Sequence, residues 1–183
     1  MQIEQIELHD LIEKSKKKKT GNKMIVGFTI NQFLKENKEP VMGAGTAKII
    51  AEKFPKIKKE LGNKLDCPAP DYIHHFAIDG IDLIAFTVKP SYVKAWKDRR
   101  NIVPHMRDEF YTGQLVPGWA ARAQVNLIML SLNELNKFMS AHPEVNVYLP
   151  LPGCGAGELN WEQTVRPLIE DSAHPRIKFY TKP

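Results

Sequence analysis

The sequence predicts an α/β domain of three layers, in which helices cover both faces of a mixed β-sheet. Apolar runs of strand length alternate with helical patterns, and two of those runs flank the pair Asp79-Gly80. Alternating strands and helices are typical of parallel sheets, whereas an Asp-Gly pair between apolar runs indicates an antiparallel hairpin. With 183 residues, 43% of them hydrophobic, the chain suits a single domain over 1–183 with a full core.

Apolar runs and glycine or proline breaks define the elements of the first half. We expect a short strand over 2–8, a loop or frayed helix end over 14–23, a strand over 24–30, an irregular segment over 31–40, a glycine turn over 41–46, a helix over 47–54 and one or two further turns over 56–61. The continuous apolar run MIVGFTI favours a strand buried on both faces. Pro55 ends the helix expected over 47–54.

The second half continues the same alternation after the hairpin. We expect hairpin strands over 72–78 and 81–88, a long segment over 89–118, a helix over 122–139, a strand over 145–151, a glycine turn over 152–159, a separate turn over 160–163, a helix over 164–171 and a closing strand over 176–180. Segment 89–118 has no clear period, and loops of that length are usually functional or contain local helices. Pro167 fits only the first turn of a helix, which separates that helix from the turn before it.

Charge and composition exclude several classes of protein. The net charge of +5 comes from 14–23, because without its six lysines the chain has 20 basic and 21 acidic residues. No apolar run approaches the roughly 18 residues of a membrane span, and the first ten residues do not resemble a signal peptide. Two cysteines make no disulfide framework, and no metal motif occurs. We therefore expect a cytoplasmic protein with no membrane contact and no metal.

Two glycine-rich turns, each between a predicted strand and a predicted helix, are the candidate binding elements. They comprise Gly43, Ala44, Gly45 and Thr46, and Gly153, Cys154, Gly155, Ala156 and Gly157. Successive backbone N–H groups with a helix behind them make a cradle for phosphate, and two such turns could hold a diphosphate. Either turn alone favours a structural role, whereas the two turns together favour phosphate binding. A P-loop and a dinucleotide fingerprint are both missing, which disfavours ATP hydrolysis and hydride transfer.

Three stretches of the sequence carry a resemblance to a known family. They are VMGAGTAKIIAEKF over 41–54, IDGIDLIAFTVK over 78–89 and LPLPGCGAGELNW over 149–161. Together they resemble a macro domain, the ADP-ribose-binding fold, with 89–118 as an extra segment. The most similar branch contains the terminal ADP-ribose protein glycohydrolase, the ADP-ribose-1''-phosphate phosphatases and related phage and bacterial proteins.

The resemblance implies roles for two polar residues outside the glycine turns. Asp10, in His9-Asp10-Leu11 at the expected end of the first strand, would bind the adenine amino group. The family has glycine where this chain has His9, and the alternative is a solvated loop aspartate. Asn31 would lie near the distal ribose with a catalytic role, and its alternative is a turn-forming asparagine.

Lys89 is the candidate nucleophile. In the glycohydrolase branch, a lysine at the end of the corresponding strand attacks the anomeric carbon of the ribose. A nucleophilic lysine must be neutral, and the alternatives are a surface lysine or a cation that contacts phosphate. That branch also has an acid/base aspartate in the second glycine turn, where this chain has Gly157 followed by Glu158. A phosphatase-like or water-based hydrolysis would need another base, for which the candidates are His9, His74, His75 and His105, and the alternative for each is a structural histidine.

These observations leave three functions open. The first is a hydrolase that acts on ADP-ribose derivatives, whose partners would be ADP-ribose itself or ADP-ribosylated protein or nucleic acid. The second is a non-catalytic module that reads or sequesters ADP-ribose, and the third is an RNA-binding protein that uses 14–23 and the arginines of 89–118. We expect a monomer that needs no cofactor, in which Cys154 packs in the turn without thiol chemistry.

Overall fold

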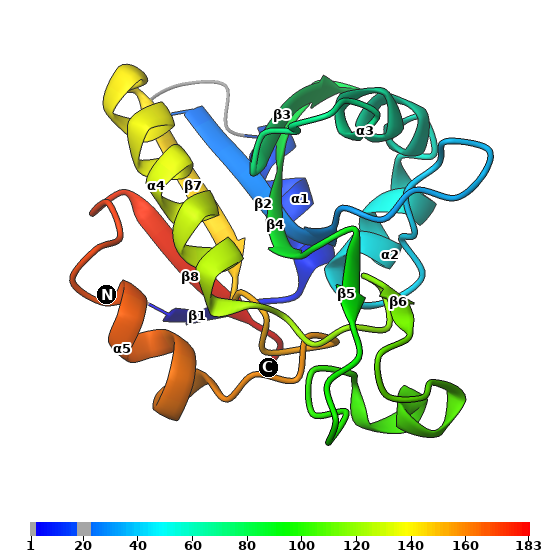
Figure 1. Cartoon of the computed structure of the whole chain (residues 1–183). Helices are drawn as coiled ribbons and strands as arrows, with labels where there is room; N and C mark the ends of the chain where they lie inside the picture. Colours follow the sequence, from blue (N-terminus) through cyan, green and yellow to red (C-terminus); the bar gives the residue numbers. More distant parts are fainter. Residues whose placement is uncertain (1–2, 18–22) are drawn as a thin grey trace.

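The computed structural model describes residues 3–17 and 23–183, and its main element is a six-stranded sheet (Figure 1). The strands follow the order β1-β8-β7-β2-β4-β3. Their bounds are β1 Ile3–Gln5, β2 Lys23–Asn31, β3 Ile73–Ile78, β4 Ile81–Lys89, β7 Val145–Pro150 and β8 Ile177–Thr181. All neighbours pair in parallel except β3 and β4, which form the antiparallel hairpin that Asp79-Gly80 predicted.

Helices cover both faces of this sheet, which confirms the three-layer α/β/α prediction (Figure 1). The helices are α1 Leu8–Lys17, α2 Gly45–Lys53, α3 Ile57–Leu65, α4 Val125–Ala141 and α5 Arg166–Ile169. Apolar side chains of α1, α2 and α3 share one buried cluster with Val26 and Phe28 of β2. Those of α4 and α5 share the other cluster with Ile25 of the same strand. Alternate residues of β2 therefore belong to opposite cores, as its uninterrupted apolar run predicted.

The first element is shorter than the sequence predicted. The strand expected over 2–8 ends at Gln5, and α1 begins at Leu8. Leu8, Leu11 and Ile12 are buried together, and their spacing of three and four residues suits a helix. His9 and Asp10 therefore belong to a helix instead of a strand end. Of the lysine-rich stretch 14–23, residues 18–22 lie outside the described residues.

The helix near the C-terminus also differs from its expected bounds. A π-helical turn, η2 (Trp161–Val165), precedes α5, and the helix expected over 164–171 is confined to α5. The side-chain oxygen of Asn160 accepts a hydrogen bond from the N–H of Gln163 at 2.7 Å. Pro167 lies in the first turn of α5, where backbone N–H groups have no partner within the helix, so its missing N–H costs no hydrogen bond.

Segment 90–118 forms a small unit of its own beside the sheet. It contains β5 (Tyr92–Lys94), β6 (Leu115–Pro117) and a short 3₁₀ helix, η1 (Pro104–Glu109). The strands β5 and β6 pair antiparallel, and the segment has a separate small apolar cluster. That cluster consists of Ala95, Ile102, Val116 and Ala120. The segment expected to be long and irregular thus contains two short strands and a 3₁₀ helix.

In the described ranges, no helix combines the length and the apolar character that crossing a bilayer requires.

Candidate active site

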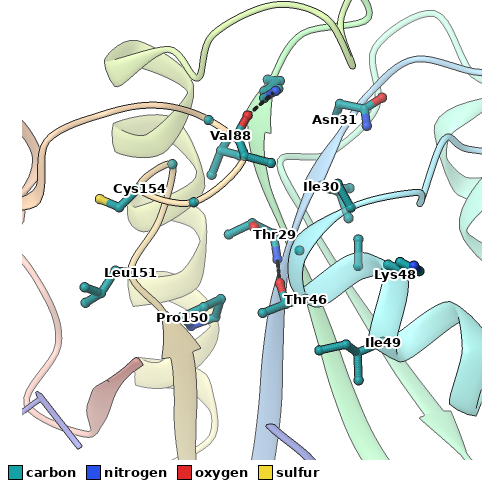
Figure 2. Close-up of a pocket in the computed structure, with 18 of the residues that line it drawn as sticks. Thr29, Ile30, Asn31, Thr46, Lys48, Ile49, Val88, Pro150, Leu151 and Cys154 are labelled. Atoms are coloured by element: carbon teal, nitrogen blue, oxygen red, sulfur yellow. Dashed lines mark hydrogen bonds between the residues drawn. The ribbon is translucent and has the colours of Figure 1, made fainter. Parts of the chain in front are cut away.

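A cavity of about 770 Å³ opens at the carboxyl ends of four neighbouring parallel strands, β8, β7, β2 and β4 (Figure 2). Parallel strands end at the same edge, so the loops that follow them converge there. Both glycine turns line this cavity, as do Asn31 and Lys89. The fold therefore brings together all the candidate residues of the sequence analysis except Asp10.

Asp10 lies in the first turn of α1, exposed and outside the cavity lining. The neighbouring Leu8 does line the cavity, at the end near β8. Thr181 and Lys182 line the same end. No sequence motif marked these residues, although the end of the closing strand is a position where a ligand site could have been expected.

The first glycine turn leads directly into helix α2. Gly45 has a φ of 57°, a left-handed conformation that glycine adopts without strain. The side-chain oxygen of Thr46 accepts a hydrogen bond from the N–H of Thr29 at 3.3 Å, which ties the turn to β2 (Figure 2). Ala44 precedes the helix and offers no side chain to cap it. The first N–H groups of α2 are therefore open to an anion.

The second glycine turn packs closely against the segment that precedes α4. A Cβ at Gly157 would lie 2.4 Å from the carbonyl oxygen of Gly153 and 2.7 Å from the Cβ of Ala123. At Gly155, by contrast, a Cβ would meet open space. The N–H of Ala123 donates to the carbonyl of Gly157 at 3.0 Å and fixes this packing. The aspartate that the resemblance implies at 157 would therefore require the turn to shift.

Lys89 is a buried cation held by two carbonyl groups, with 6% of its surface exposed. Its Nζ donates to the carbonyl oxygen of Ala156 at 2.8 Å and to that of Trp119 at 3.2 Å. Burial lowers the pKa of the Lys89 ammonium to about 8, and the charge of Glu158 acts in the opposite direction. A pKa of this size makes a substantial neutral fraction available slightly above neutral pH. The reading of Lys89 as a surface lysine is therefore wrong.

Asn31 lies directly beside Lys89 because β2 is irregular at its end. The register shifts between Ile30 and Asn31, so that Asn31 stands opposite Lys89 of β4. Its amide nitrogen donates to the carbonyl of Val41 at 2.9 Å, and its oxygen accepts from the N–H of Phe33 at 3.1 Å. These are the contacts of a turn-forming asparagine. They also hold the start of the first glycine turn against the end of β2.

Cys154 lines the cavity without the features of a reactive thiol. Its side chain is half-buried against the apolar cluster beneath α4. Burial raises the pKa of the thiol to about 11, so the thiolate is scarce near neutral pH. The N–H groups of the turn do not offset this burial, which agrees with a packing role.

Positive charge predominates in the cavity. Its titratable lining residues are Lys48, Lys89, His105, Cys154, Tyr180 and Lys182, and no Asp or Glu lines it among the described residues. Nor do the described ranges contain a group of three His, Cys, Asp or Glu side chains that could hold a metal ion. The arrangement suits an anion bound by backbone N–H groups and ammonium groups.

Sequence patterns did not identify the wall formed by segment 90–118 and the adjoining Trp119. Val103, His105 and Trp119 line the cavity at the Lys89 end. Trp119 contributes both its side chain, 37% exposed, and the carbonyl that accepts from Lys89. The sequence offered His105 as one of four candidate bases. Because this segment has no periodic pattern, nothing in the sequence predicted that Val103 or Trp119 would face the site.

The fold is shared with several solved structures, although no family model and no curated protein matches the sequence. The macrodomain of Mycobacterium tuberculosis DarG superposes with a TM-score of 0.59 at 15% identity, covering 90% of this chain and 92% of that one. The macrodomain of Thermus aquaticus DarG gives 0.61 at 13% identity, covering 100% and 97%. Thermosipho africanus DarTG, solved in complex with ADP-ribose, gives 0.58 at 12% identity, covering 85% of this chain and 37% of the other.

Proposed function

Since the chain has the macrodomain fold, we propose that its cavity binds ADP-ribose or an ADP-ribose derivative and that Lys89 promotes hydrolysis at the distal ribose. The observation that carries this proposal is Lys89 itself, a buried amine at one end of a cleft built from two glycine turns. A relative with the same fold, Thermosipho africanus DarTG, was solved with ADP-ribose bound, which supports the choice of ligand.

In the proposed binding mode, the diphosphate lies between the two glycine turns. The N–H groups at the start of α2 and those of 153–157 face the phosphate oxygens, while the lysines of the lining offset the negative charge. The distal ribose lies at the Lys89 end and the adenosine at the β8 end. Asp10 remains our candidate for the adenine amino group, although reaching it requires the ligand to extend beyond Leu8.

The proposed reaction uses the neutral amine of Lys89. Its lone pair attacks the anomeric carbon of the distal ribose, and the bond to the leaving group breaks with its electron pair. The carbonyls of Ala156 and Trp119 orient Nζ, and the side chain of Asn31 holds the start of the first glycine turn through the carbonyl of Val41. Water then releases ADP-ribose from the enzyme. Most of the rate enhancement would come from this positioning.

A non-catalytic reader of ADP-ribose is the second candidate, and one observation favours it. No carboxylate lines the cavity among the described residues, and Gly157 cannot carry a side chain without moving Gly153 or Ala123. The acid/base aspartate of the glycohydrolase branch therefore has no direct equivalent here. In a reader, Lys89 would serve as a cation beside the phosphates or ribose.

Calorimetric titration with ADP-ribose, with AMP and ATP as controls, tests the ADP-ribose binding that both candidate functions require. We expect saturable binding of ADP-ribose and much weaker binding of AMP and ATP. Absence of heat at high protein concentration would contradict both candidates. Binding to RNA that weakens steeply with salt, without ADP-ribose binding, would favour the RNA-binding alternative instead.

Turnover assays then separate the hydrolase from the reader. Candidate substrates are ADP-ribosylated protein, ADP-ribosylated nucleic acid and ADP-ribose-1''-phosphate. Release of ADP-ribose in excess over enzyme identifies a hydrolase and its leaving group. Tight binding with no release from any substrate supports the reader.

A further inference from the structure

The cavity end at Lys89 is closed by η1 and its flanking residues. The N–H of Val103 donates to the carbonyl of Ala120 at 3.0 Å, one residue after Trp119, whose carbonyl accepts from Lys89. Ile102 and Val103 are buried and anchor the start of η1. His105, two residues further on, is exposed and lines the cavity. His105 and Lys89 therefore line the same cavity.

The turn of η1 is held from behind by an arginine that has no part in the cavity lining. The guanidinium of Arg99 donates to the carbonyl of Arg107 at 3.0 Å, at the end of η1. The side chain of His105 makes no hydrogen bond to the protein within 3–17 and 23–183. Its ring nitrogens are therefore available to a ligand. The hydrogen bonds of Val103 and Arg99 fix the backbone of η1 that carries this side chain.

The proposed reaction needs a proton donor, and few residues of the cavity can supply one. When the bond to the leaving group breaks, the departing oxygen takes the electron pair and must be protonated unless it is already a stable anion. The Tyr180 hydroxyl is buried and donates to the carbonyl of Gly27 at 3.0 Å. The Cys154 thiol is half-buried, and Lys182 lies at the opposite, β8 end of the cleft. Lys48, on α2, forms an ion pair with Glu52 at 3.8 Å.

Resting on the hydrolase function proposed above, we propose that His105 is the general acid that protonates the leaving oxygen of the substrate. As Lys89 Nζ bonds to the anomeric carbon, the carbon–oxygen bond breaks, its electron pair stays on oxygen, and the imidazolium N–H proton moves to that oxygen. The neutral imidazole then accepts a proton from the water that hydrolyses the lysine adduct. An imidazole ring can both donate and accept a proton, so the same group can serve both steps.

Glu158 is the rival for this role because its charge influences Lys89. Its side chain is exposed and is not part of the cavity lining. Its backbone adopts a φ of 62°, and its carbonyl accepts a hydrogen bond from the Arg122 guanidinium. These features describe a residue that shapes the second glycine turn from outside the cleft.

Two substrates with different leaving groups test the assignment. We would measure kcat for an alkyl ADP-riboside, whose alkoxide must be protonated, and for para-nitrophenyl ADP-ribose, whose phenolate leaves without a proton. His105→Gln should lower kcat for the alkyl substrate about 10²–10⁴-fold and for the nitrophenyl substrate by less than about tenfold. Lys97→Gln, an exposed change on the same segment, should alter neither value.

The outcomes separate this assignment from the function on which it rests. Equal loss on both substrates, no loss, or the selective loss appearing with Glu158→Gln instead would overturn the role of His105 while leaving the hydrolase intact. Unchanged ADP-ribose affinity in His105→Gln excludes misfolding as the cause of a loss. If the unaltered protein releases neither leaving group, the hydrolase function fails and the role of His105 fails with it.

Discussion

Lys89 Nζ lies 2.8 Å from the carbonyl oxygen of Ala156, so a hydrogen bond joins the end of β4 to the second glycine turn. A lysine ammonium carries three donors and no acceptor, and two of its donors are taken by Ala156 and Trp119. The third is available to a ligand or to water. The protein thus orients the amine with neutral carbonyls, which stabilise the ammonium form less than a carboxylate partner would.

Removing this amine should separate binding from catalysis. Lys89→Met keeps an unbranched side chain of similar volume and should reduce turnover about a thousandfold or more, because the nucleophile is lost. ADP-ribose affinity should change by less than about tenfold, since backbone N–H groups supply most contacts in the proposed mode. Stopped-time assays and calorimetry on the same preparation check both values. Retained turnover in Lys89→Met would remove the lysine from the mechanism.

The pH dependence should differ in sign between the hydrolase and the reader. The pKa of Lys89 is lowered to about 8, chiefly by burial, so the amine is mostly charged below that pH and mostly neutral above it. For para-nitrophenyl ADP-ribose, whose leaving group needs no proton, a nucleophilic Lys89 therefore predicts that turnover rises as pH increases through about 8. A Lys89 that only attracts phosphate predicts that affinity falls over the same range. Measuring kcat and Kd across this interval distinguishes the two.

Gly155 and Gly157 of the second turn should respond differently to replacement by alanine. Gly157→Ala places a Cβ 2.4 Å from the Gly153 carbonyl oxygen and should destabilise the protein by about 1–3 kcal/mol, with weaker ADP-ribose binding. Gly155→Ala is the matched control, because its Cβ meets no atom within 4 Å. Its thermal midpoint should stay unchanged. Equal destabilisation by both changes would contradict the packing described for this turn.

Stability at acidic pH should depend on His74. This residue is 4% exposed, its Nε2 has no hydrogen-bond partner among the described residues, and burial lowers its pKa from 6.5 to about 4. Between those values the unfolded chain binds a proton that the folded chain does not, so the free energy of unfolding falls as pH falls. The loss should reach at most about 3 kcal/mol.

His74→Leu should flatten this dependence, because it removes the titrating group and retains an apolar side chain on β3. Denaturant unfolding at a series of pH values between about 4 and 6.5 measures the slope in both proteins. An unchanged slope in the variant would assign the acid sensitivity to other groups.

Local patterns were sufficient for most of the fold. The uninterrupted apolar run of β2 required two covered faces, and the Asp79-Gly80 pair specified the antiparallel hairpin of β3 and β4. The strand predicted over 2–8 was wrong in its second half. Leu8, Leu11 and Ile12 form the buried face of a helix, and the apolar residues before them resemble a strand. In the last helix, the π-turn of η2 follows from backbone bonds to Asn160 that have no distinctive sequence pattern.

The sequence by itself determined that each of the two glycine turns follows a strand. It also determined that Lys89 lies at the end of the strand predicted over 81–88. Both are consequences of local chain chemistry: glycine permits the turns, and apolar runs of strand length have identifiable ends. Only the tertiary structure decided that Lys89 is buried against the carbonyls of Ala156 and Trp119, residues 67 and 30 positions away. Such burial sets the protonation of an amine, and it depends on contacts between distant segments that no local pattern encodes.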